Sequence, residues 1–240
     1  MKMDVNSNKY TFIFSAIMVV VVAFVLALAS ESLKPFQESN VKREKMQNIL
    51  AACGIDVERD EAESVYDKFI GASNEIMLDT KGQPITNPEK RPFEIDVLYE
   101  YKSGGQRNFP VFRCQMEDGE TLYVLPMVGK GLWGPIWGYA AVGADFNTLK
   151  GATFDHKGET PGLGAEINKD DFEKQFIGKK IFNDDMEFAS VKVIKGGADP
   201  SDTHGVDAIS GGTITSNGVT EMLQRTFRAY EPFLKSKMNS

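Results

Sequence analysis

The sequence predicts an α+β fold, in which a largely antiparallel sheet packed with helices follows one N-terminal transmembrane helix. An uncharged apolar run near the start predicts the membrane helix, and an Asp-Gly turn between two β-forming runs predicts an antiparallel hairpin. Strand and helix patterns then mix without a regular βαβ alternation. This irregular order disfavours a doubly wound parallel sheet.

The membrane segment covers residues 11–30, which carry no charged side chain. Twenty helical residues span about 30 Å, the thickness of the hydrocarbon core of a bilayer. We expect a single span retained in membrane lipid, preceded by a short tail of residues 1–10. A cleaved signal peptide is the alternative, because Ala27-Leu28-Ala29 resembles a cleavage site. Basic residues flank both ends of the run, so charge alone leaves the orientation open.

The composition of the chain argues against several classes of function. The chain has 240 residues, a net charge of -7, two histidines and two cysteines. The negative charge argues against a nucleic-acid partner, and two histidines exclude a His-rich metal centre and leave little for a Ser-His-Asp apparatus. We therefore expect no hydrolase and no protein-bound metal. Cys53 and Cys114 are either buried thiols or one bridge.

The elements after the span divide into a membrane-proximal helical and β region, residues 31–108, and a C-terminal domain, residues 109–240. Periodicity and turn signals place the individual elements. We expect helices at 31–53 (ending at Gly54), 60–70, 170–176 and 216–230, a loop at 80–93, a hairpin at 109–127, and strands at 136–142, 151–154 and 188–194.

A glycine-rich stretch, from Asp207 to Ser216, precedes the last predicted helix. Gly211 and Gly212 permit close backbone approach, and a helix start offers unpaired N–H groups and the positive end of its dipole. The stretch is typical of a phosphate cradle surrounded by hydroxyl side chains. The alternative is a plain loop that caps a helix.

Two other loops are also rich in glycine. The first, residues 129–139, holds both tryptophans of the chain, Trp133 and Trp137, among glycines and a proline, which suits a flat ring ligand or a partner surface. The second is Glu159-Thr160-Pro161-Gly162-Leu163-Gly164. Each of these loops, taken alone, also has a purely structural interpretation. The tryptophans of the first loop could be core residues, and the second loop could be a structural turn.

Together, Gly-x-Gly-Leu-Trp-Gly, Glu-Thr-Pro-Gly-Leu-Gly and Asp-x-x-Ser-Gly-x-Thr occur in an order that resembles the FMN-binding domain family with covalent flavin. Its members include the C subunit of sodium-translocating NADH:quinone oxidoreductases and the G subunit of Rnf electron-transfer complexes. The resemblance implies an FMN esterified through its phosphate to Thr213 by a separate flavin transferase. Gly212 departs from the family pattern, which usually has alanine there. Glycine only removes one methyl group, so the backbone can still follow the same path.

The resemblance also implies the roles of the neighbouring residues. Asp207 and Ser210 are earlier positions of the third motif, and Gly211, Gly212 and Thr215 belong to the phosphate cradle. The loop with Glu159, Thr160, Gly162, Leu163 and Gly164 is expected to touch the isoalloxazine ring, with Trp133 as a further neighbour.

The implied function is one covalent flavin station on the path of electrons from NADH to quinone (ubiquinone), coupled to sodium export. The chain would be one subunit of a translocase, catalysing no complete reaction alone, with other subunits and the flavin transferase as partners. The span would hold the soluble domain on the extracytoplasmic side of a bacterial inner membrane. The length of the whole chain and the sizeable region between the span and the first glycine motif favour the C subunit of the sodium-translocating enzyme. The alternatives are the Rnf G subunit, a module that binds FMN without a covalent bond, and a membrane-anchored assembly or binding module without a redox group.

Overall fold

The computed structural model describes residues 7–102 and 108–239, and the chain forms two compact units, Met1–Glu44 and Lys45–Ser240. The helix α1 (Asn8–Ala52) begins in the first unit and ends in the second. In the first unit its apolar side chains, such as Phe12, Val19 and Leu26, are exposed. Within the described residues, α1 is a helix long and apolar enough to cross a membrane, which makes it a candidate span.

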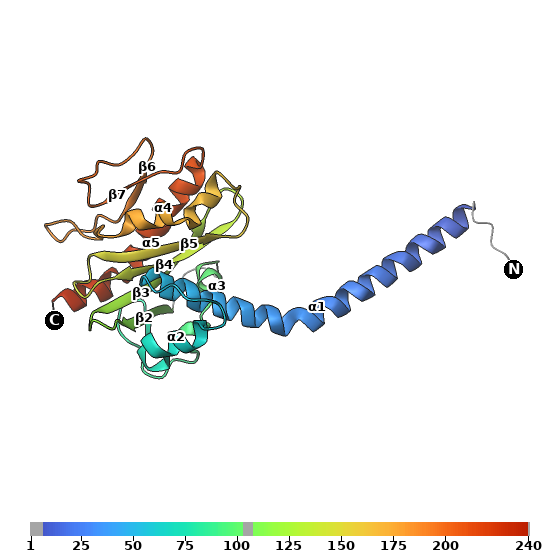
Figure 1. The fold of residues 1–240 in the computed structure, drawn as a ribbon, viewed down its shortest axis with the longest axis horizontal. Helices are drawn as coiled ribbons and strands as arrows, with labels where there is room; N and C mark the ends of the chain where they lie inside the picture. Colours follow the sequence, from blue (N-terminus) through green and yellow to red (C-terminus); the bar gives the residue numbers. More distant parts are fainter. Residues whose placement is uncertain (1–6, 103–107, 240) are drawn as a thin grey trace. The chain divides into compact units, whose positions relative to one another are not determined.

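The second unit is built on a five-stranded antiparallel sheet in the order β1-β2-β3-β4-β5 (Figure 1). The hairpin predicted at 109–127 is confirmed, and it turns at Gly119, whose φ of 90° suits glycine. The strands are β1 (Glu75–Leu78), β2 (Phe109–Gln115), β3 (Thr121–Lys130), β4 (Pro135–Val142) and β5 (Leu149–His156).

The sheet separates two hydrophobic cores, because successive side chains of a strand point to opposite faces. On one face Leu125 and Met127 of β3 pack with the helix α5 (Thr213–Met238). On the other face Val124 joins Leu50, from the end of α1, and Tyr66 of the helix α2 (Ala62–Phe69). Each face of the sheet is thus covered by helix, as the α+β prediction requires.

Short elements complete the second unit. The helix α4 (Asp170–Glu173) and a two-stranded parallel sheet of β6 (Lys192–Ile194) and β7 (Gly205–Asp207) lie beyond β5 (Figure 1). The remaining elements are α3 (Val97–Lys102) and the 3-10 helices η1 (Ala72–Asn74), η2 (Pro92–Glu94), η3 (Gly164–Asn168) and η4 (Lys174–Phe176).

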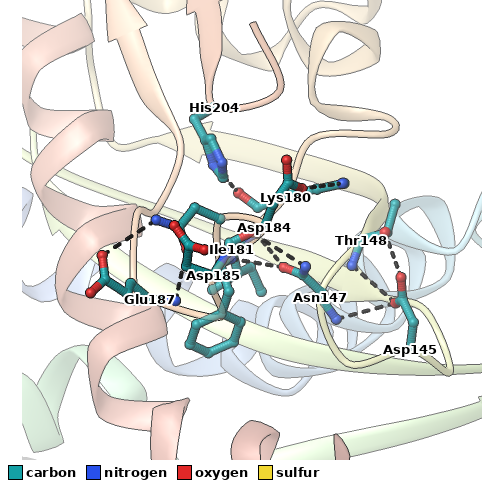
Figure 2. A network of polar contacts seen from close by, with 11 residues as sticks. Asp145, Asn147, Thr148, Lys180, Ile181, Asp184, Asp185, Glu187 and His204 are labelled. Atoms are coloured by element: carbon teal, nitrogen blue, oxygen red, sulfur yellow. Dashed lines mark hydrogen bonds and ion pairs between the residues drawn. The ribbon is translucent and has the colours of Figure 1, made fainter.

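A polar network fastens the chain between η4 and β6 to the turn that joins β4 and β5 (Figure 2). The side-chain oxygen of Asn147 accepts from the N–H groups of Ile181 and Phe182 at 3.0 and 2.7 Å. Nearby, Nδ1 of His204 lies 2.8 Å from the carbonyl oxygen of Lys180. These bonds hold a segment with little regular structure of its own, so that it leads back to β6 and β7.

The structure corrects several predicted boundaries. The last helix begins at Thr213 rather than at 216 and continues past 230 to Met238. The strand predicted at 188–194 is wrong before Lys192, because Ser190 has a φ of 63°, which breaks an extended chain. The helix predicted at 170–176 is α-helical only in its first turn and continues as η4. Neither α3 nor β7 was predicted.

Candidate functional site

The predicted acceptor threonine, Thr213, is the first residue of α5. Gly211 has a φ of 74°, a conformation that glycine adopts without strain, and it turns the chain from β7 into the helix. Gly212 stands at the N-cap position. The first intrahelical hydrogen bond runs from the N–H of Ser216 to the carbonyl oxygen of Gly212 at 2.9 Å. The N–H groups of residues 213–215 therefore precede the helical ladder, as an anion site at a helix start requires.

A buried carboxylate, Glu159, connects the three glycine-bearing segments. Its Oε2 accepts from the hydroxyl of Thr215 at 2.6 Å, and its Oε1 accepts from the N–H of Trp133 at 2.8 Å. Burial alone would raise the pKa of Glu159, which is 5% exposed, but bonds from Thr215 and from the N–H groups of residues 132–134 outweigh it. The pKa therefore lies below its ordinary value, and Glu159 is ionised at neutral pH.

This carboxylate also explains two glycines of the motifs. A Cβ on Gly164 would lie 2.5 Å from both Oε2 of Glu159 and Oγ1 of Thr215. A Cβ on Gly131 would lie 2.6 Å from Oε1 of Glu159. Each loop thus approaches the carboxylate so closely that a side chain would displace it.

A pocket of about 240 Å³ opens beside Thr213. Its walls come from the β3–β4 turn, from the loop after β5 and from the first turn of α5. It is lined by Leu132, Glu159, Thr160, Leu163, Gly164, Gly211, Gly212, Thr213, Ile214 and Thr215.

The structure brings most of the predicted site residues together at this pocket, with different degrees of access. Thr213 is exposed at the pocket, whereas Thr215 is only 1% exposed and its hydroxyl is directed to Glu159. Thr160 shapes its own loop, since its carbonyl oxygen accepts from the N–H groups of Leu163 and Ala165 at 3.1 Å.

Four predicted site residues do not line the pocket. Gly162 has a φ of 75° and donates its N–H to Glu166, so it shapes the loop after β5. Asp207 accepts from the N–H of Ala198 at 2.7 Å and lines a separate cleft of about 720 Å³. Ser210 is exposed before Gly211, and the side chain of Trp133 is 69% exposed although its N–H reaches Glu159.

Two pocket residues, Leu132 and Ile214, were missed by the sequence analysis. They are 48% and 57% exposed, and Leu163 beside them is 41% exposed. Large apolar side chains that stay exposed around a pocket are the usual lining of an organic ligand site. Both lie inside the glycine motifs, one before Trp133 and one after Thr213, but neither belongs to a periodic pattern that could have distinguished it.

The helix-start pocket lies in a part of the chain, residues 131–228, that matches the sequence pattern described as "FMN-binding domain". That match covers all three glycine segments except the first two residues of the first one.

Similarity to named relatives extends over almost the whole chain. The chain is 32% identical to the C subunit of the Na(+)-translocating NADH-quinone reductase of Haemophilus ducreyi, over 97% of this chain and 95% of the relative. It is also 32% identical to the corresponding protein of Vibrio alginolyticus, over 89% of each chain. The chain therefore belongs to the family formed by the C subunits of Na(+)-translocating NADH-quinone reductases.

Solved structures agree with this assignment. The corresponding C subunit of Parabacteroides distasonis superposes with a TM-score of 0.75 at 42% identity, over 84% of this chain and 96% of that one. The NqrC of Shewanella oneidensis gives 0.71 at 26% identity, over 83% and 99%.

Proposed function

We propose that this chain is a flavoprotein subunit of a Na(+)-translocating NADH-quinone reductase and carries FMN as a phosphoester on Thr213. The observation that carries the proposal is the position of Thr213, an exposed threonine and the first residue of α5, at a pocket lined by residues from all three glycine-bearing segments. The family match over 131–228 and the relatives from Na(+)-translocating NADH-quinone reductases support it.

The start of α5 fits a phosphate group. A phosphoester on Thr213 keeps an anionic oxygen, and the N–H groups of residues 213–215 and the helix dipole would stabilise that charge. Gly211 and Gly212 leave room beside the threonine, and Thr213-Ile-Thr-Ser216 adds no acidic side chain to the first turn. Glu159 lies deeper, with its oxygens already engaged by Thr215 and Trp133.

The surroundings of the pocket fit a flat apolar ring. A volume of about 240 Å³ is smaller than the pockets that enclose drug-sized ligands, so we expect part of the FMN to stay outside it. Leu132, Leu163 and Ile214 offer exposed apolar surface at the pocket, and the side chain of Trp133, next to Leu132 in the sequence, is exposed as well. An FMN held at such a surface would remain open to electron-transfer partners.

In this proposal FMN supplies the redox chemistry when bound, and the protein's residues attach, orient and partly bury it. Thr213 fixes the phosphate end, and the loops joined through Glu159 hold the apolar side chains at the pocket. Electron transfer itself asks for no general acid or base at the site. A tethered flavin also cannot diffuse away, as a fixed station between NADH and quinone requires.

We expect α1 to anchor the chain in the lipid of a bacterial inner membrane, with Lys45–Ser240 on the extracytoplasmic side. Other subunits of a sodium-exporting complex and a flavin transferase would be its partners. The named relatives, which match over nearly the full chain, favour this complex over an Rnf-type complex.

The proposal is tested by intact-mass analysis of the chain co-expressed with a flavin transferase. We expect an added mass equal to FMN less one water, on the tryptic peptide that contains Thr213. Thr213→Ala should lose at least nine-tenths of the adduct, because no other hydroxyl of the motif has the same position. Thr203→Ala, an exposed threonine before β7, is the matched control and should keep it.

Other results would contradict parts of the proposal. An adduct that persists in Thr213→Ala would exclude this threonine as the attachment site. Yellow protein that releases all its flavin on denaturation would show non-covalent binding. A colourless preparation made with active transferase would favour an assembly or binding module without a redox group.

A further inference from the structure

Glu159 is the one acidic or basic side chain among the described residues that line the pocket beside Thr213. It is only 5% exposed, although carboxylates are almost never buried unless they are paired. Its carboxylate accepts from the hydroxyl of Thr215 at 2.6 Å and from the N–H of Trp133 at 2.8 Å, and both donors are neutral. The attachment of FMN to Thr213 does not itself need a buried charge at this place.

This carboxylate is ionised and held in a fixed position. Its Oε1 faces the N–H of Trp133, which can only donate, so this oxygen has to accept. Burial alone would raise the pKa of Glu159, but the hydrogen bonds that it accepts outweigh burial and hold the pKa below its ordinary value. A Cβ on Gly131 or Gly164 would lie 2.6 or 2.5 Å from a carboxylate oxygen, so the backbone of both loops encloses the negative charge closely.

The lysines nearest to these loops in the sequence do not line the pocket. Lys130 is the last residue of β3 and Lys157 directly follows β5, and both are exposed. Exposed charges are screened by water and salt, whereas a buried charge is screened much less. Among the side chains around the pocket, Glu159 therefore contributes most to the electrostatic potential that a bound ring experiences.

We propose that the charge of Glu159 lowers the reduction potential of the FMN carried on Thr213, an inference that rests on the function proposed above. Reduction in mildly alkaline buffer adds two electrons and one proton to FMN, so its ring gains one negative charge. A buried negative charge at the same pocket makes this gain less favourable, and charge near the ring is a means by which proteins tune flavins. At an effective dielectric constant of about 20, a unit charge about 10 Å away changes an equilibrium constant about tenfold. Glu159 thus makes the reduced FMN a stronger electron donor.

The experiment measures the midpoint potential of the flavin on the full chain, co-expressed with a flavin transferase and kept in detergent in mildly alkaline buffer. Glu159→Gln keeps the shape of the side chain and removes its charge, so the two-electron midpoint should rise by about 30 mV, the equivalent of a tenfold change. Glu159→Asp keeps the charge and should stay near the parent, which separates the charge from a disturbance of the loops. The phosphate on Thr213 is the same in every variant, so it does not contribute to the differences.

The matched control is Glu166→Gln, which removes the same charge from a nearby position in the sequence. Glu166 is half-buried and lines the separate cleft of about 720 Å³ rather than the pocket beside Thr213. Its replacement should shift the midpoint only slightly. An unchanged midpoint in Glu159→Gln, or an equal rise in Glu159→Asp or Glu166→Gln, would overturn the inference.

A second measurement decides the question if Glu159→Gln carries too little flavin. The reduced-minus-oxidised infrared difference spectrum of the parent should contain a carboxylate stretching band, because reduction changes the electric field at Glu159. This band should shift in Glu159→Asp and stay in place in Glu166→Gln, and a parent spectrum without it would equally overturn the inference. A parent without covalent flavin would contradict the proposed function as well, whereas a flavin-loaded parent that fails these tests would leave that function intact.

Discussion

At the scale of single residues, Glu159 organises the site, because one carboxylate accepts bonds from two of the glycine segments. Glu159→Gln keeps the shape but replaces one acceptor oxygen by an NH₂ group, which cannot accept from both Thr215 and Trp133. We expect the free energy of unfolding to fall by about 1–3 kcal/mol and flavin attachment to slow. Denaturant unfolding and the initial rate of adduct formation measure the two effects.

The matched control for this change is Glu166→Gln. Glu166 accepts a single N–H, from Gly162 at 2.8 Å, and the carbonyl oxygen of glutamine can accept the same bond. Its effect should stay within about 0.5 kcal/mol. Equal stability and equal attachment rates in both variants would contradict the role given to Glu159. Since the folded pKa of Glu159 is lowered, its contribution to stability should be present above its unfolded pKa and lost as the pH falls.

The site residues show what sequence could and could not reveal. The motifs pointed to Thr213 and to the loop from Glu159 to Gly164, and Thr213 meets most of that loop at one pocket. The burial of Glu159 could not be predicted, because a glutamate before Thr-Pro-Gly reads as an exposed turn residue. Its burial depends on three loops that are distant in sequence and meet only in the folded chain.

At the scale of elements, patterns with strong local signals were predicted well. The Asp-Gly hairpin and the stop of α1 at Gly54, with a φ of 77°, follow from turn and cap chemistry. The start of α5 at Thr213 was missed because Thr-Ile-Thr has low helix propensity, which the packing of the helix on the sheet overrides. The helix likewise passes Pro232, since Phe233 and Leu234 are buried in the same core.

The contact between α4 and β5 should make stability depend on pH. Glu173 of α4 accepts from the N–H of Phe154 in β5 at 2.6 Å. Burial raises the pKa of Glu173 to about 7 against that bond, and Asp170, Asp155 and Asp56 add repulsion. The folded state thus favours the protonated carboxyl. The contribution of Glu173 to the free energy of unfolding is therefore present below its unfolded pKa and is lost as the pH rises through about 7.

We therefore expect the free energy of unfolding to fall between about pH 5 and pH 8, by on the order of 2 kcal/mol from this group. Glu173→Gln, which can still accept from Phe154, should remove most of that dependence. Glu221→Gln, an exposed glutamate on α5, should leave it unchanged. Denaturant unfolding at several pH values measures this dependence. If the free energy of unfolding of the parent rises over this range, Glu173 is not the source of a pH dependence of the expected sign.

At the scale of the whole molecule, the chain combines a membrane-type helix with a domain that has its own cores. The division of contacts falls between Glu44 and Lys45, and both hydrophobic cores belong to Lys45–Ser240. The predicted division at residues 30 and 108 stays a prediction. We expect the part from Lys45 onward to fold without the first unit, since its buried residues begin at Met46.

The apolar part of α1 determines whether the chain stays in the membrane. Its most apolar stretch has a mean hydropathy of 3.0 and no buried residues, so in water these side chains would be exposed without a partner element. If the span is retained, the mature chain should resist extraction by alkaline carbonate, dissolve in detergent, and yield peptides from residues before Ala27. A variant lacking residues 1–44 should appear in the soluble fraction with the thermal unfolding midpoint of the parent's folded domain. A mature chain that begins just after Ala29 and dissolves without detergent would show instead that the segment is a cleaved signal peptide.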